Sequence, residues 1–330
     1  MQDIQYDDQY LLAQKRQGTI GMSLCVFMVV WIAAASVLSA CFPYFLPKGF
    51  LEKSIGTILV SDIAQYLIAL PIAIMIMRAV PTLASREFPM SLRQFLGFYA
   101  VSWPVLCCGS LIGKTLASII TDGKAKNRIS ETIASGNMWE ALVFVVILTP
   151  IVEEWFFRKQ ILSRLRAYGE KKAIVFSALA FALFHMNIFQ FFYTFGLGLI
   201  LGYMYVRTSK LRYSIFLHMI VNFQGSVVAL WLLKQMTDAK GNLIEVDKLS
   251  NEELMNLPSG FVLVGLYEIF MFAVLIVGIV LLVRNRRYLV FYDAPLELPK
   301  KDNLKSLYGT VGVITFLIIS VILNVMMLFS

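Results

Sequence analysis

The stretch PIVEEWFFR at residues 150–158 determines how this chain is interpreted. It continues a strongly apolar run that begins at residue 138 and predicts a membrane-spanning helix, yet it holds two adjacent carboxylates, Glu153 and Glu154. An ionised side chain near the centre of a bilayer costs about 3 kcal/mol or more, so such residues are retained where they are paired or needed for chemistry. The stretch therefore predicts a polar site inside the membrane.

Helix geometry separates the two acids. Glu154 and Arg158 are four residues apart, which places them on one face of a helix where they can form an ion pair. Glu153 is turned about 100° from Glu154 around the helix axis, away from Arg158. Pro150 removes one backbone hydrogen bond just before the acids, and the bends that proline causes in membrane helices often line polar cavities. We therefore expect Arg158 to neutralise Glu154 and Glu153 to be free to take up a proton.

The composition predicts a membrane protein. Of the 330 residues, 58% are hydrophobic and only 15% are charged, whereas soluble domains are about 25% charged. The apolar runs predict an all-α fold, a polytopic transmembrane helical bundle within the lipid bilayer of the cell membrane. The net charge of +8 does not indicate nucleic-acid binding, because the basic residues lie in short turns and form no basic stripe with interleaved aromatic residues.

Apolar segments predicted to cross the membrane lie at 19–42, 57–79, 91–119, 138–166, 171–186, 188–206, 212–233, 260–283 and 307–329. The fifth and sixth are close to the lower limit of about 17 residues for a span, so they are either two spans or one sharply broken, re-entrant unit. The bundle therefore has eight or nine spans, with polar loops at 122–137 and 234–257. We expect three parts: two accessory helices after a polar N-terminus (1–90), a central core (91–234), and a loop with two C-terminal helices (235–330).

The distribution of basic residues predicts the orientation. Alternate loops, starting with the N-terminal segment, carry 20 of the 29 lysines and arginines. Short cytoplasmic loops are enriched in these residues, so the N-terminus is expected in the cytoplasm and the C-terminus outside. Glu153 then falls in the cytoplasmic half of its helix.

Two further acids and four cysteines lie in apolar surroundings. Asp62, near the start of the second predicted span, is interpreted as a first-turn acid at the membrane interface. Glu268, in the middle of the eighth, is expected to be paired within the bundle or to face a cavity. The cysteines form no disulfide framework or zinc motif and are expected to be inert. Residues 38–41, LSAC, resemble a lipoprotein cleavage box, so lipidation of Cys41 is an alternative to an uncleaved first span.

The two histidines of the chain both lie in the same central third as Glu153. His185 follows Phe181 by four residues, so the aromatic ring can pack on the imidazole, and His218 precedes Asn222 by four residues on one helix face. Three helices thus present an acid, two imidazoles and an amide, which suit activation of a water and stabilisation of an oxyanion. Each residue also has a structural alternative, as a packed histidine or as part of an ion cluster that holds helices together.

The motifs EExxxR at 153–158, FxxxH at 181–185 and HxxxN at 218–222 resemble those of the CAAX-protease and bacteriocin-processing family, which includes the type II CAAX prenyl endopeptidases. The resemblance covers about residues 92–233. Pro150 and Asn187 fit the pattern as well, whereas Lys159 stands where many relatives have a small residue.

The resemblance implies a glutamate-dependent intramembrane endopeptidase. No cofactor and no metal are expected, although the sequence does not decide whether a metal takes part. The resemblance also implies that Glu153 activates the attacking water with help from His185, and that His218 and Asn222 stabilise the oxyanion. Supporting roles are implied for the side chains of Glu154, Arg158 and Phe181. The expected substrate is a membrane-embedded or lipidated peptide or protein, and the implied roles are peptide maturation, bacteriocin immunity or membrane signalling.

Other functions fit parts of the pattern. A zinc-dependent intramembrane protease could use Glu153 and the two histidines as ligands, but the HExxH motif is absent and a catalytic zinc would still need a separate base. A non-catalytic membrane scaffold or immunity protein could bind a partner through the same cavity. A transporter is disfavoured, since transporters usually have paired inverted halves and this chain has none.

Overall fold

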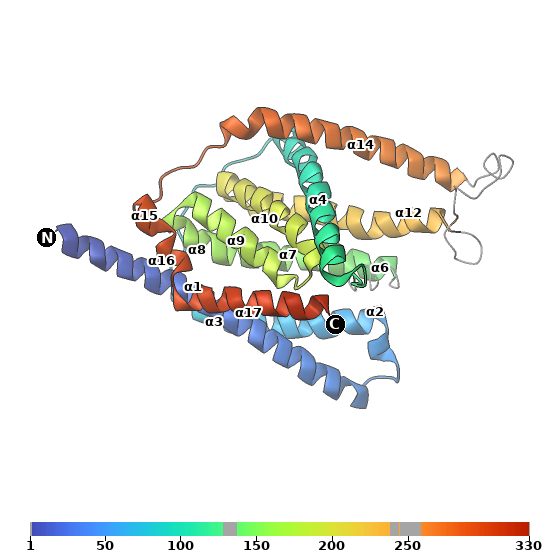
Figure 1. Ribbon diagram of the computed structural model, residues 1–330, viewed down its shortest axis with the longest axis horizontal. Coiled ribbons are helices and arrows are strands. Elements are labelled where there is room, and N and C mark those ends of the chain that lie inside the picture. The colour runs from blue at the N-terminus through green and yellow to red at the C-terminus, as the bar shows by residue number, and fades with distance from the viewer. Residues whose placement is uncertain (1, 128–136, 238–243, 245–258, 330) are drawn as a thin grey trace.

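Where the structure describes the chain, its regular elements are all helices. A computed structural model describes residues 2–127, 137–237, 244 and 259–329, and the predicted loops at 122–137 and 234–257 lie largely outside these described residues. The predicted fold class, an all-α polytopic bundle, is confirmed (Figure 1). The division of the chain into three parts stays a prediction.

In the described part of the chain, seven helical segments are long and apolar enough to cross a membrane: Tyr6–Tyr44, Ser54–Met77, Leu92–Thr121, Ile188–Thr208, Leu211–Gln235, Gly260–Tyr288 and Val311–Leu328. Each coincides with a predicted span. The chain is therefore a multi-pass membrane protein.

The two other predicted spans are helical as well but fail as simple spans, for different reasons. The fourth is a continuous succession of α6 (Met138–Glu140), η4 (Ala141–Leu148), α7 (Thr149–Glu154), η5 (Trp155–Leu162) and α8 (Ser163–Leu165). It carries too many charged residues for a simple span. The fifth, α9 (Glu170–Phe184), has only 15 residues. These two segments carry Glu153, Glu154 and His185. The charged residues of the fourth segment and the early end of the fifth, which make them poor spans, are therefore also what forms the polar site.

The remaining elements are α1 (Gln2–Cys41), η1 (Phe42–Tyr44), η2 (Phe50–Glu52), α2 (Ser54–Asp62), η3 (Ile63–Ala69), α3 (Leu70–Met77), α4 (Leu92–Thr121), η6 (Arg166–Tyr168), α10 (Ile188–Thr208), α11 (Leu211–Phe223), η7 (Gln224–Val228), α12 (Ala229–Gln235), α14 (Ser259–Asn285), η9 (Arg286–Tyr288), α15 (Lys300–Asn303), α16 (Lys305–Tyr308) and α17 (Val311–Leu328). The polar N-terminal segment is thus helical and continuous with the first span. The ninth predicted span is broken near Gly309, between α16 and α17.

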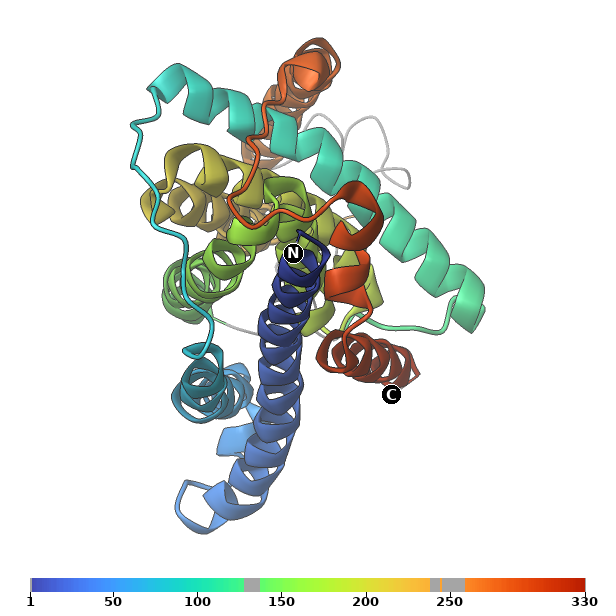
Figure 2. The same cartoon turned by 90° about the vertical axis from the view of Figure 1, so that its left-hand side faces the viewer.

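The helices lie in three groups. The helices α7 to α10 lie in the middle, with α1, α3 and α17 on one side and α4 and α14 on the other (Figures 1 and 2). The N-terminus, α15 and α16 lie at one end of the bundle, whereas α2, α6, α12 and the C-terminus lie at the opposite end (Figure 1).

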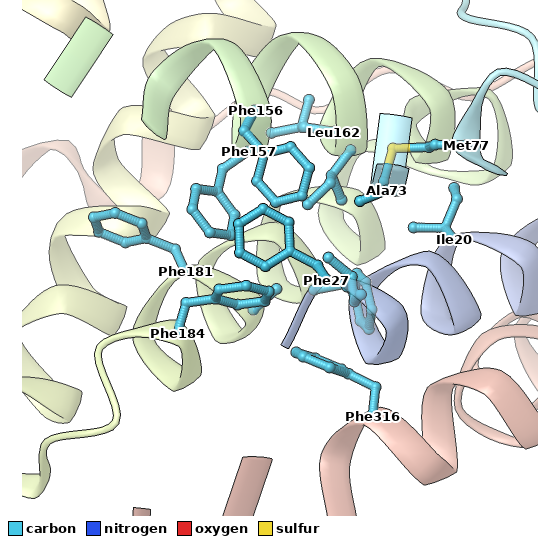
Figure 3. Close-up of a cluster of buried hydrophobic side chains, with 14 of the residues drawn as sticks. Ile20, Phe27, Ala73, Met77, Phe156, Phe157, Leu162, Phe181, Phe184 and Phe316 are labelled. Carbon is cyan, nitrogen blue, oxygen red and sulfur yellow. The ribbon is translucent and has the colours of Figure 1, made fainter. Parts of the chain in front are cut away.

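A cluster of aromatic side chains fixes the helices that carry the site (Figure 3). Phe27 of α1 stacks on Phe156 of η5 with ring centroids 5.1 Å apart and meets Phe184 of α9 edge-on at 4.8 Å. Phe316 of α17 contacts Phe184 as well, at 5.9 Å. Such pairs are worth about 0.5–1.5 kcal/mol each beyond the area they bury, so they hold η5 and α9 in one arrangement.

Glycines let α10 approach its neighbours closely. A Cβ atom on Gly198 would lie 2.9 Å from the Cα of Ala178 in α9, and one on Gly109 of α4 would lie 2.5 Å from the backbone of Tyr193. Close backbone approach through small residues is typical of membrane helices. The helix α10 is therefore held between α4 and α9.

The expectation for Glu268 is wrong. Its side chain is exposed on α14 and has no ion pair with another described residue. The contact face of α14 includes Val264 and Gly278, and Glu268 lies beside this stripe rather than within it. Because α14 is apolar on all sides, the sequence alone gave no indication of which face contacts the bundle.

Candidate active site

A cavity of about 940 Å³ lies between α2, α4, α7, α9, α10 and α11. Its lining includes the four residues predicted to be catalytic, which are Glu153, His185, His218 and Asn222. Three sequence segments separated by more than 30 residues each thus contribute to one polar space. The cavity also reaches Ser54 and Glu140, which are hydrogen-bonded to each other at the end of the bundle where α2 and α6 begin.

The structure contains the ion pair expected between Glu154 and Arg158. The Arg158 Nε lies 3.0 Å from Oε2 of Glu154, and both side chains are fully buried. The guanidinium also donates to Oγ of Ser177 at 2.9 Å and lies over the ring of Phe181, 5.2 Å from its centroid. A buried charge pair needs further hydrogen bonds to offset its desolvation. Ser177 supplies one, and it ties η5 to α9.

Glu153 points away from this ion pair. Its Oε2 atom is buried and has no hydrogen-bond partner among the described residues. The nearest ionisable contact is Nε2 of His218, at 3.8 Å. That separation is too long for a direct hydrogen bond and too short for a water to lie in line between the two atoms, so a water bonded to both would lie to one side of them. Glu153 therefore faces the imidazole of His218 in the cavity.

His218 is oriented by the neighbouring acid. Its Nδ1 lies 3.3 Å from Oε1 of Glu154, and since an ionised carboxylate can only accept, Nδ1 carries the hydrogen. The other ring nitrogen, Nε2, then faces Glu153. The sequence did not predict this contact, because the partners are 64 residues apart. Glu154 thus has two contacts: it balances the charge of Arg158, and it accepts a hydrogen bond from the imidazole of His218.

His185 is placed by the turn between α9 and α10. Its Nδ1 lies 2.8 Å from the carbonyl oxygen of Phe181, so Nδ1 donates and Nε2 remains available. After His185 the backbone enters the left-handed region at Met186, with φ of 45°, and the side chain of Asn187 caps α10 by accepting from the N–H of Phe189. The fifth and sixth segments are therefore two helices joined by a sharp turn that presents the imidazole.

Phe181 contacts both imidazoles. Its ring meets that of His185 edge-on at 4.9 Å and that of His218 at 5.5 Å. The first contact follows from the i, i+4 spacing, whereas the second is formed between helices and was not predicted. Phe181 is itself fully buried, so it limits the rotation of both rings.

Asn222 is only partly free to act on a substrate. One of its Nδ2 hydrogens is donated to the carbonyl oxygen of Val145, at 2.9 Å. The η4 segment is π-helical, and a π-helical bond to that carbonyl would come from residue 150, which is a proline without an N–H. Asn222 therefore satisfies an acceptor that Pro150 leaves open. A second N–H of the amide remains for another partner in the cavity.

Asp62 is not in the first turn of its helix, as the sequence suggested, but is the last residue of α2. It lines the cavity, and its Oδ2 atom is buried with no hydrogen-bond partner among the described residues. Tyr66, four residues later, donates to Oγ1 of Thr149 at 3.4 Å and so ties η3 to α7. The cavity position of Asp62 could have been predicted from the sequence, because an ionisable residue within a membrane span is by default a candidate for a functional site.

A metal site finds no support in the described residues. They contain no group of three His, Cys, Asp or Glu side chains placed to hold a metal ion. Glu153, His185 and His218, the ligands of the zinc alternative, do not form such a group, although each imidazole has its Nε2 open.

Comparison with known proteins covers the same segment. Residues 135–224 match the family described as Type II CAAX prenyl endopeptidase Rce1-like. The chain is also 39% identical over 100 residues to the membrane-embedded CAAX protease MroQ of Staphylococcus aureus (strain USA300). Over these residues the chain is similar to the CAAX protease family. The alignment to that CAAX protease covers 28% of this chain and 39% of the relative, so the chain spans about two-fifths of the length of the protein it matches. No solved structure matches the chain.

The match to the CAAX protease family includes all seven predicted site residues and excludes Asp62. The family segment therefore supplies α7, α9 and α11. Helices outside the match, α2 and η3 among them, complete the cavity around it.

Proposed function

We propose that this protein is an intramembrane endopeptidase that hydrolyses a peptide bond of a membrane-associated or lipidated peptide. The observation that carries the proposal is the position of Glu153 Oε2, which lies in a cavity 3.8 Å from an imidazole nitrogen and has no hydrogen-bond partner among the described residues. A carboxylate whose oxygen is free in this way can act as a general base toward a water. The similarity of residues 135–224 to the CAAX protease family supports peptide hydrolysis as the reaction class.

The proposed reaction begins with a water held between Glu153 and the histidines. Glu153 removes one proton as the water oxygen attacks the peptide carbonyl carbon, and the carbonyl oxygen gains the negative charge. The free N–H of Asn222, together with His218 when its Nε2 is protonated, stabilises this oxyanion. Glu153 then gives its proton to the departing amine, so that the carboxyl has its original charge at the end.

The remaining polar residues position these groups. His185, with its Nδ1 fixed, accepts a hydrogen bond from the attacking water at Nε2. Glu154 holds His218, and Arg158 holds Glu154. In this way the fully buried ion pair acts on the reaction through the orientation of one imidazole.

Metal chelators should leave the activity unchanged. Purified protein treated with EDTA or 1,10-phenanthroline is expected to cleave a fluorogenic peptide at a rate within about twofold of the untreated sample, because the site fits no catalytic metal. The rate of fluorescence increase is the measurement. Loss of cleavage that added zinc restores would contradict the proposed mechanism and favour the zinc-dependent alternative.

The cavity is proposed to open on the outer side of the membrane. Ser54 and Glu140 line the cavity where α2 and α6 meet, at the end of the bundle opposite the N-terminus (Figure 1). The basic loops lie at the other end, and such loops favour the cytoplasm. A peptide that has reached the outer face, or an outward-facing segment of a membrane-inserted peptide, would then have access to Glu153.

Labelling of introduced cysteines tests this orientation. In a variant without native cysteines, Lys114→Cys is expected to react with a membrane-impermeant maleimide in intact cells. Arg286→Cys, at the basic end, is expected to react only after permeabilisation. Both side chains are exposed, so accessibility to the reagent should differ only through the membrane. The reverse pattern would place the cavity mouth in the cytoplasm.

A further inference from the structure

Asp62 has an unusual position for an acid in a membrane protein. It is the last residue of α2, lines the same cavity as Glu153, and its Oδ2 is buried without a hydrogen-bond partner among the described residues. It forms no ion pair in the described part of the chain. Acids within a membrane are normally paired or belong to a substrate pathway. Asp62 is not paired with a described residue, so we consider the second possibility.

Among the described residues, the candidate cations are bound to other groups or are not paired with Asp62. Arg158 is bound to Glu154. Lys114 and Lys126 also line the cavity, but both are exposed and neither is paired with Asp62. A bound metal ion would need several ligands, and no group of three suitable side chains is found in the described residues. The missing cation is therefore best supplied by a molecule that enters the cavity.

Two contacts bound the distance between Asp62 and Glu153 along the bundle. The helices that carry them begin at the same end of the bundle, at α2 and α6 (Figure 1), and are joined by the Ser54–Glu140 and Tyr66–Thr149 hydrogen bonds. Asp62 is nearer than Glu153 to that end. At 1.5 Å per residue the offset is about 8 Å when counted from the first contact and about 12 Å when counted from the second, which is the length of roughly two to four residues of an extended peptide.

We propose that Asp62 forms a cation-binding subsite, which accepts an ammonium or guanidinium group of the substrate roughly two to four residues from the bond to be cleaved. This proposal rests on the proposed function of the cavity and adds a substrate class to it: peptides with one positive charge on the side of the scissile bond that lies toward the end of the bundle where α2 and α6 begin. A lysine or arginine side chain and a free N-terminal amine share this chemistry.

The first test measures binding, so that it does not depend on turnover. Full-length protein carrying Glu153→Gln is titrated with otherwise neutral peptides that contain a single lysine at successive positions. One position is expected to lower the Kd by about tenfold or more, as one charge-assisted hydrogen bond would. Adding Asp62→Asn should remove this preference, whereas Asp122→Asn, an exposed acid outside the cavity, should leave it unchanged.

Charge exchange excludes a purely structural effect. Asp62→Lys is expected to reverse the preference, so that a glutamate at the favoured position binds more tightly than a lysine there. Acetylated peptides with an internal lysine and unacetylated peptides without one distinguish a side chain from an N-terminal amine. A preference that survives Asp62→Asn would overturn the proposal, as would equal weakening of neutral and lysine-containing peptides.

Cleavage by the wild-type protein separates this proposal from the broader one. If neutral peptides are cleaved but lysine gives no advantage in KM at any position, the subsite is wrong and the protease function stands. If lysine-dependent binding is found in peptides that no active variant cleaves, the subsite stands and the protease function is wrong.

Discussion

Glu153→Gln is expected to lower the rate of peptide cleavage by about 10³-fold or more. A general base contributes about 10²–10⁴-fold, and glutamine keeps the shape of the side chain while losing the ability to take a proton. The measurement is cleavage of a fluorogenic peptide by full-length protein in detergent or liposomes. Because the Oε2 atom has no hydrogen-bond partner in the described residues, the amide should fit without loss of stability.

A glutamate in another membrane helix provides the matched control. Glu268→Gln makes the same chemical change on the exposed side of α14, outside the cavity, and should leave the rate within about twofold, as is usual for surface substitutions. Cleavage retained by the Glu153→Gln protein would rule out the proposed mechanism. If that protein also still confers the biological phenotype of the wild type, the scaffold or immunity alternative is favoured.

The parts of the site that the sequence predicts are those formed within a single helix. The Glu154–Arg158 pair and the Phe181–His185 contact both follow from i, i+4 spacing, and both are present. The contact between His218 and Glu154 joins two helices whose relative rotation no local pattern encodes. Apolar length and charge likewise predict where helices lie, but not which neighbours they have.

Asp62 and Glu268 show that the sequence does not predict which way a side chain faces on its helix. Each is an acid in an apolar segment, and the sequence offers one physical argument for both, the cost of an unpaired charge in lipid. The structure places Asp62 in the cavity and Glu268 on the exposed side of α14. The difference lies in helix rotation, which is set by packing partners from distant parts of the chain.

Removal of the buried cation should be the most damaging single change to the fold. Arg158→Leu leaves the carboxylate of Glu154 fully buried without its charge partner and also removes a hydrogen bond to Ser177. Breaking one side of a buried ion pair costs about 3–5 kcal/mol, which is a large share of the stability of a typical protein. The expected result is a much lower yield of folded protein and a lower Tm in detergent. Lys159→Leu, at the next position and exposed, should change the Tm little.

A double variant distinguishes the loss of charge balance from the loss of packing. Combining Arg158→Leu with Glu154→Gln removes both charges, so much of the lost Tm should return, because the uncompensated carboxylate is the main cost. Activity should recover less than stability, since a neutral amide holds the Nδ1 hydrogen of His218 less firmly than a carboxylate does. If the double variant is as unstable as Arg158→Leu alone, the guanidinium stabilises the fold through Ser177 and Phe181 rather than by balancing Glu154.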